Sequence, residues 1–73
     1  MKIGTKVICT LKGMLNGYVG YLSRIGYNTV YPYVIVQDKK DVGKSYIELK
    51  RQYGLWSGYF NIFSLEQITE IKK

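Results

Sequence analysis

Short segments of alternating apolar residues, each bounded by turn residues, constrain the fold of this chain most strongly. From Ile3 to Leu11 every second side chain is suited to burial, and 18–25, 33–37, 46–50 and 59–63 are further strand-like segments. Alternation of this kind predicts β-strands with one buried face. Strands this short expose unpaired edges unless their sheet closes on itself. We therefore expect an all-β fold, a small and strongly bent barrel of about five strands.

The connections between these segments carry recognisable turn residues. Residues 12–17 predict a loop that ends in Asn16-Gly17, a pair that tolerates positive φ. Pro32 stands just before the third strand, where its missing amide does least harm, and 38–44 is predicted to be a charged turn. Residues 51–58 predict a loop or a short connecting strand.

The C-terminal residues have a different pattern. Ser64 and Gln67 have the spacing of a capping box, in which each side chain bonds the backbone amide of the other residue. This spacing predicts one short helical or 3-10 turn near residues 64–68. Residues 68–71 then alternate again and predict an edge strand that pairs with the N-terminal strand.

Length and composition indicate one folded domain that spans 1–73. Apolar residues make up 47% and charged residues 22% of the chain, far from the composition of disordered proteins. No apolar run approaches the ~20 residues of a membrane span, and lysines interrupt the N-terminal residues, so we expect no membrane contact and a cytoplasmic location. The single cysteine, Cys9, has no partner for an internal disulfide and no histidine to activate it, which predicts a small buried side chain.

The stretch NGYVGYLSRIGY, residues 16–27, is unusually rich in glycine and tyrosine. Gly17 is expected to permit a turn, and Gly20 to let the strand bend or another backbone approach closely. Gly26 is expected to end the strand. The apolar residues between them do not keep a period of two, which predicts a β-bulge near Ser23 or Arg24.

The same stretch resembles the core of the KOW motif. That motif has a glycine, two residues, a second glycine, and aliphatic residues two and five positions further on; these are Gly17, Gly20, Leu22 and Ile25 here. KOW motifs occur in ribosomal proteins and transcription elongation factors. The resemblance covers roughly residues 3–37 and implies an SH3-like barrel that binds RNA, binds protein or is purely structural. The closing LWSGYF and SLEQI also resemble small barrels encoded by bacteriophages, which implies a viral protein in the host cytoplasm.

Aromatic residues are the main candidates for binding. The chain has eight tyrosines, one tryptophan and two phenylalanines, more than a core of this size hides, so some rings are expected at the surface. Aromatic faces beside cations hold single-stranded nucleic acids, and the same residue types anchor protein interfaces. Cations and aromatic residues that are close in sequence give the candidate binding residues Arg24, Tyr27, Lys50, Arg51, Tyr53 and Trp56. For Tyr53 and Trp56, packing in the core is an open alternative to contact with a ligand or a protein.

The chain is strongly basic. Eleven Lys and Arg against five Asp and Glu give a net charge of +6 and attract polyanions at long range. The lysines of 38–44 share their turn with Asp38 and Asp41, and we expect a solvated charged turn there. Lys50 and Arg51 are the better candidates for binding.

The sequence gives little support to catalysis. It has no histidine, its carboxylates are scattered, and it contains no phosphate-binding glycine loop of a known kind, so we expect a non-enzymatic protein without metal or cofactor. The leading hypothesis is binding of RNA or DNA through the basic and aromatic residues. A protein-binding module, such as a phage-encoded modulator of a host protein, is the alternative. The third is a homo-oligomer that sequesters a small anionic ligand.

Overall fold

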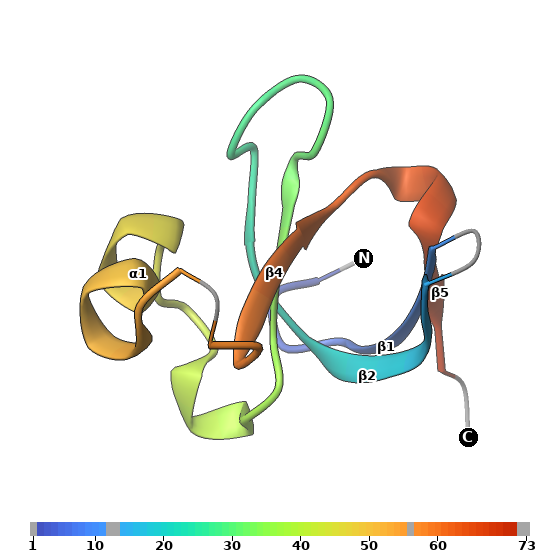
Figure 1. Cartoon of the computed structure of the whole chain (residues 1–73). Coiled ribbons are helices and arrows are strands. Elements are labelled where there is room, and N and C mark those ends of the chain that lie inside the picture. Colours follow the sequence, from blue (N-terminus) through green and yellow to red (C-terminus); the bar gives the residue numbers. More distant parts are fainter. Residues whose placement is uncertain (1, 12–13, 56, 72–73) are drawn as a thin grey trace.

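The computed structural model describes residues 2–11, 14–55 and 57–71. These described residues form one α-helix, α1 (Tyr46–Tyr53), and two 3-10 turns, η1 (Lys39–Asp41) and η2 (Leu65–Gln67), which lie between or beside the strands (Figure 1). The strands are β1 (Lys6–Leu11), β2 (Met14–Ile25), β3 (Tyr33–Val36), β4 (Phe60–Phe63) and β5 (Ile68–Glu70).

All five strands belong to one antiparallel sheet in the order β4-β3-β2-β1-β5. The prediction of a five-stranded, mainly β structure is therefore confirmed. The sheet is not closed, because no ladder among the described residues joins the edge strands β4 and β5. Figure 1 shows a strongly curved sheet in which η2 leads from one edge strand to the other.

The C-terminal prediction is confirmed. The Ser64 amide donates to Gln67 Oε1 at 2.9 Å, and η2 begins at the next residue. Strand β5 then pairs antiparallel with β1, with Cys9 opposite Ile68 and Val7 opposite Glu70. The last strand therefore covers the edge of the first, as the alternation of residues 68–71 predicts.

The predicted strand over 46–50 is wrong, because these residues form α1. The Ser45 amide donates to Glu48 Oε1 at 3.0 Å and the Glu48 amide to Ser45 Oγ at 3.2 Å, a complete capping box that starts a helix. Hydrogen bonding of the Glu48 carboxyl to Ser45, first of all to its amide, lowers the pKa of that carboxyl below its usual value. The helix continues to Tyr53, so 51–58 contain no connecting strand among the described residues, and Gly54 ends the helix with a φ of 88°.

The glycines of the opening stretch have three different outcomes. Gly17 lies inside β2 rather than in a turn, since that strand already begins at Met14 and runs through Asn16-Gly17. Gly20 is confirmed as a site of close approach: a Cβ there would lie 2.6 Å from the Val36 carbonyl oxygen. Gly26 follows the end of β2 with a φ of 92°, as expected of a residue that ends a strand.

The predicted bulge is also confirmed. The β2–β3 register shifts between Leu22 and Arg24, so Ser23 is the extra residue. Its side chain is buried although it is polar.

Among the residues that the structure describes, buried side chains form two clusters, one on each face of the sheet. The first cluster contains residues of β1, β2, β3, β4 and β5: Val7, Cys9, Leu22, Ile35, Phe63 and Ile68. The second contains Val34, Val36 and Phe60 of the sheet and Leu49 of α1. Successive residues of β3 thus serve both clusters, because strand side chains alternate between faces. Helix α1 covers the second face of the sheet, and burial of its Leu49 there stabilises the helix in this position.

Cys9 is a buried hydrophobe, as predicted, with no exposed surface. Burial raises the pKa of its thiol to about 12, so almost no thiolate forms near neutral pH. We expect Cys9 to resist a thiol reagent such as iodoacetamide in the native protein and to react fully in denaturant, which mass spectrometry measures. Rapid labelling of the native protein, with its fold verified by circular dichroism, would contradict this burial.

Candidate binding surface around helix α1

Helix α1 carries three of the six predicted site residues and lies on one side of the sheet (Figure 1). Its inward face is formed by Tyr46, Leu49 and Tyr53, which repeat at helical spacing and pack on the second cluster. The residues between these positions are exposed, and apart from Ile47 they are polar. The packing of α1 therefore places Lys50 and Arg51 in solvent.

An aromatic row lies at the N-terminal end of α1. The ring of Tyr27 lies 4.5 Å from that of Tyr46, and Tyr46 in turn meets Phe60 edge-on at 5.3 Å. Phe60 is buried, whereas Tyr27 keeps 44% of its surface exposed. The exposed ring is therefore supported from behind by a ring that is itself fixed to the sheet.

A second aromatic pair lies at the C-terminal end of α1. The rings of Tyr53 and Tyr59 are 4.8 Å apart, and Tyr59 keeps 53% of its surface exposed. Tyr59 also borders a shallow hollow of about 390 Å³ with Lys39. Each end of the helix thus presents one exposed tyrosine backed by a second tyrosine.

The tyrosine at the end of α1 is held by a buried carboxylate, Asp41. This side chain is 1% exposed; it accepts hydrogen bonds from the Tyr53 hydroxyl and from Lys44 Nζ, the latter at 2.9 Å. Burial alone raises the pKa of Asp41, but these two hydrogen bonds and the charges of Lys44 and Lys40 outweigh it, so the pKa is lowered. The same hydrogen bond raises the pKa of Tyr53 to about 12.

The expectation of a wholly solvated charged turn over 38–44 is therefore wrong for Asp41 and holds for Lys39 and Lys40, which are exposed. Asp41, the last residue of η1, is buried against its hydrogen-bond partners Tyr53 and Lys44. The sequence contains no local signal for this, since Asp41 differs from Asp38 only in its tertiary neighbours.

The bulge residue Ser23 fastens this turn to the sheet. Its hydroxyl lies 2.7 Å from the Lys44 carbonyl oxygen and 3.2 Å from that of Asp41, and it accepts a hydrogen bond from the Gly43 amide at 3.1 Å. Next to it, Arg24 Nε donates to the Gly43 carbonyl oxygen at 2.6 Å. Two residues of β2 thus fix the segment that leads into α1.

The structure brings together five of the six predicted binding residues and does so around α1. Arg24 and Tyr27 lie toward its N-terminal end, Lys50 and Arg51 on its exposed surface, and Tyr53 on its inward face. The sixth, Trp56, lies outside the described residues. Sequence reasoning missed Tyr46 and Tyr59, and the 46, 49, 53 spacing is the signal that identifies Tyr46.

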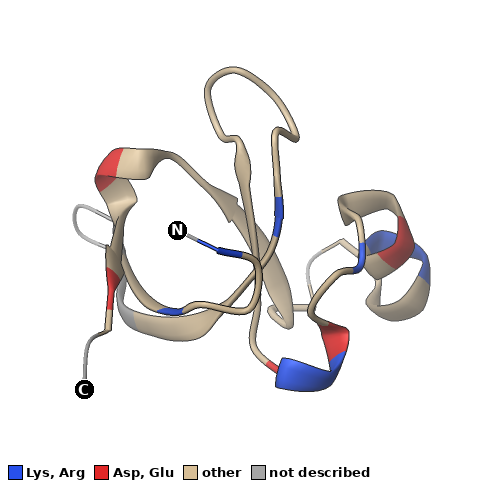
Figure 2. Ribbon diagram, turned by 180° about the vertical axis from the view of Figure 1, so that it is seen from behind, with Lys and Arg blue, Asp and Glu red and all other residues tan. Residues whose placement is uncertain are grey.

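Cations gather over this region. Figure 2 shows the Lys and Arg positions of η1 and α1 on the same side of the molecule, with carboxylates among them. In the described part of the chain the ion pairs join Lys40 to Asp38 and Lys44 to Asp41, so Lys50 and Arg51 are unpaired there. No set of three His, Cys, Asp or Glu side chains in those same residues is arranged to hold a metal ion.

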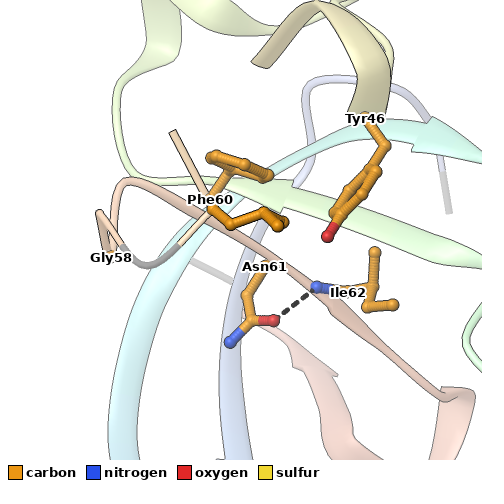
Figure 3. A pocket seen from close by; sticks show the side chains of 6 residues that line it. Tyr46, Gly58, Phe60, Asn61 and Ile62 are labelled. Carbon is orange, nitrogen blue, oxygen red and sulfur yellow. Dashed lines mark hydrogen bonds between the residues drawn. The ribbon is translucent and has the colours of Figure 1, made fainter. Parts of the chain in front are cut away.

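A hollow of about 330 Å³ lies between α1 and the edge strand β4 (Figure 3). Its lining residues are Tyr46, Leu55, Gly58, Phe60, Asn61 and Ile62. A second hollow, of about 240 Å³, continues along β4 and shares Asn61 and Ile62 with the first, adding Tyr31 and Gln67. Together these two hollows are called the β4 groove below.

Comparison with known proteins finds no matching family, no matching curated protein and no matching solved structure. Among the helices of the described residues, none has the length and apolar character to cross a membrane.

Proposed function

We propose that this protein is a non-enzymatic, cytoplasmic module that binds single-stranded nucleic acid over the surface of α1. The observation that carries the proposal is the pairing of exposed tyrosines with exposed cations around one helix. Tyr27 and Tyr59 are the exposed rings; they pack on the first and last tyrosines of α1, the helix that carries the exposed Lys50 and Arg51. Stacked bases and neutralised phosphates need these two kinds of group side by side.

The two exposed tyrosines act as stacking platforms. Each has a second tyrosine behind it, so its ring is already oriented and little rotamer freedom is lost on binding. The supporting rings, Tyr46 and Tyr53, are the first and last residues of α1, about 10 Å apart along its axis. A flexible single strand is able to reach both platforms with non-adjacent bases, whereas a stacked duplex offers no free base faces.

The cations supply the affinity for phosphate. Lys50 and Arg51 project from α1, and Arg24 retains its terminal nitrogens because only its Nε bonds to Gly43. Each cation that neutralises a phosphate releases counterions, so binding must weaken as salt rises. The carboxylate Glu48 faces Arg24, which limits the local excess of positive charge and favours modest, stacking-assisted binding.

The fold proposal that accompanies this function is an SH3-like barrel of the KOW kind. Its support is the glycine pattern of residues 17–25, with Gly20 placed where β2 meets β3, together with the strong curvature of the five-stranded sheet. The resemblance to phage-encoded barrels supports a viral origin.

The test is fluorescence anisotropy of labelled 12-nucleotide single strands and duplexes at 50 and 200 mM salt, concentrations chosen for the steep salt effect. We expect single strands to bind more tightly than duplexes. The double substitution Tyr27→Leu with Tyr59→Leu should weaken single-strand binding at least about tenfold, since each stacked base contributes about 1–3 kcal/mol. Lys50→Gln should lower the salt slope by about one.

Lys6→Gln is the matched control, because Lys6 is an exposed lysine on β1 that is absent from the α1 surface. It should leave the salt slope and the preference for single strands unchanged. If Lys6→Gln and Lys50→Gln weaken binding equally, and duplexes bind as well as single strands, the charge acts only as a general attraction and the proposal fails.

A further inference from the structure

The β4 groove runs along an unpaired edge of the sheet. Strand β4 is the last strand in the sheet order, and in the described residues its only ladder is with β3. The Gln37 amide bonds the Tyr59 carbonyl oxygen at 3.0 Å, which sets the phase of the antiparallel ladder. Because bonded pairs alternate in such a ladder, the backbone groups of Phe60 and Ile62 point outward.

The amide of Ile62 confirms this phase. It donates to the side chain of the preceding residue, Asn61 Oδ1, at 2.9 Å, and not to β3 (Figure 3). A side chain that occupies an outward amide keeps an open edge from pairing indiscriminately. The contact is local and the Asn61 side chain is able to rotate away, so the amide is guarded rather than removed from use.

The groove also offers apolar surface on both sides of this guarded amide. Leu55 at one end and Tyr31 at the other are 45% and 42% exposed. The two hollows, about 330 and 240 Å³, meet at Asn61 and Ile62. An edge strand with side-chain hollows beside it is the arrangement to which extended peptides add as an extra strand, with main-chain bonds for affinity and hollows for specificity.

Charge decides which occupant fits. A second copy of this chain brings a net charge of +6 to a surface of the same sign, which disfavours pairing of β4 with itself. At the α1 end of the groove, the exposed Lys50 follows Tyr46 by one helical turn, whereas the exposed Glu66 precedes Gln67 at the η2 end. The lining of the groove is uncharged, with a cation one helical turn from its lining residue Tyr46 and a carboxylate next to its lining residue Gln67.

We propose that the β4 groove binds an extended segment of another protein as a sixth strand. The segment has apolar residues at alternate positions and acidic residues at the end that lies over α1. This site uses the edge of β4, not the Tyr27 and Tyr59 platforms, so it goes beyond the proposed nucleic-acid function. Binding displaces Asn61 from the Ile62 amide and places the bonds of Phe60 and Ile62 on the incoming strand.

The test begins with a displayed pool of random ten-residue peptides selected on the full-length protein at 150 mM salt. We expect enrichment of peptides with two apolar residues at alternate positions and acids at one end. N-methylation of the amides that face β4 should weaken an enriched peptide about tenfold or more, because each lost bond is worth about a factor of two to ten. Enrichment without this pattern, or binding indifferent to N-methylation, overturns strand addition.

Substitutions of Asn61 provide an independent measurement. Asn61→Ala releases the Ile62 amide and should strengthen peptide binding about threefold. Asn61→Asp keeps an acceptor for the Ile62 amide but adds a negative charge beside an acidic peptide. This substitution should weaken peptide binding about tenfold. Lys50→Gln should weaken binding of the acidic peptide, whereas Lys39→Gln, an exposed lysine on η1, should not.

Two other occupants of the groove, a second copy of this chain and single-stranded DNA, would each give a different experimental result. A dimer in sedimentation that Asn61→Ala strengthens and Asn61→Asp weakens means that a second copy fills the edge. Single-stranded DNA that displaces the peptide and loses affinity on Asn61→Asp means that the groove is part of the nucleic-acid surface. Either result overturns this inference, while failure of the Tyr27 and Tyr59 variants to affect DNA binding overturns only the proposed function.

Discussion

Replacing Gly20 by alanine is expected to lower the melting temperature by about 15 °C or more, the largest single effect foreseen for this protein. The new Cβ would lie 2.6 Å from the Val36 carbonyl oxygen and 2.7 Å from Ile35 Cγ2. Neither neighbour yields easily, because both belong to β3 at the centre of the core. Moving β2 away from β3 to make room for this Cβ should lower the free energy of unfolding by about 3 kcal/mol or more. The whole free energy of unfolding is about 4–11 kcal/mol for a chain of this size.

Thermal and urea unfolding followed by circular dichroism measure this change. Val19→Ala is the control, because Val19 precedes Gly20 on the same strand and is partly exposed; its replacement should cost less than about 1 kcal/mol. Equal stability of the Gly20→Ala variant and the wild type would mean that β2 and β3 do not approach as closely as described. If β3 instead shifts locally around the new Cβ, the loss of stability will be small and the urea m-value will be unchanged.

Removing the Asp41 carboxylate is expected to have the second largest effect. Asp41→Ala leaves the Tyr53 hydroxyl and Lys44 without their buried acceptor. Breaking a buried charged pair is strongly destabilising, and we expect about 2–3 kcal/mol here because Lys44 remains partly exposed and is rehydrated. Asp38→Ala, which removes an exposed carboxylate paired with Lys40, should cost less than about 1 kcal/mol in the same urea unfolding measurement.

The pH dependence of stability gives a second readout of the same contact. The pKa of Asp41 is lowered in the folded protein, so its contribution is present above the unfolded value of 3.8 and is lost as the pH falls through the folded pKa. The pKa of Tyr53 is raised to about 12, so its contribution is lost as the pH rises from about 10 to 12. Tyr53→Phe should reduce the alkaline loss of stability, and the remainder comes from Cys9 and Tyr18, whose pKa values burial also raises to about 12. If the alkaline loss persists unchanged, Tyr53 is not bonded to Asp41.

The sheet could be predicted from the sequence because its signals are local. Alternation placed 18–25, 33–37 and 59–63 in strands, and the 64–67 capping spacing identified η2 and the return of the last strand. The bulge at Ser23 followed from a break in the period of two. These features depend on which side chains face the core, and that preference is written into neighbouring residues.

Helix α1 was missed because two local patterns compete over 46–53. Residues 46–50 alternate like a strand, but Ser45 and Glu48 form a capping box and Tyr46, Leu49 and Tyr53 repeat at helical spacing. The helical pattern wins because those three side chains cover the outer face of β3 and β4. Giving the 45–48 spacing the same weight as the identical 64–67 spacing would have predicted the helix.

The candidate site was predicted in part, and for a reason that the helix explains. Lys50, Arg51 and Tyr53 are close in sequence and were predicted together for that reason. In α1 they face different ways: Lys50 and Arg51 are in solvent, whereas Tyr53 faces the core. Tyr59 and the β4 groove depend on tertiary packing across residues far apart in the chain. Such juxtapositions leave no period in the sequence, so only the fold reveals them.

The way in which Ser23 holds the turn before α1 bears on how this surface is able to diversify. All three partners of its hydroxyl are main-chain groups, of Asp41, Gly43 and Lys44. Main-chain groups are present whatever side chain a position carries, so residues of the turn that face solvent are free to change without loosening it. A lineage of such proteins is thereby able to alter the charge and shape presented beside α1 while the scaffold beneath it stays constant.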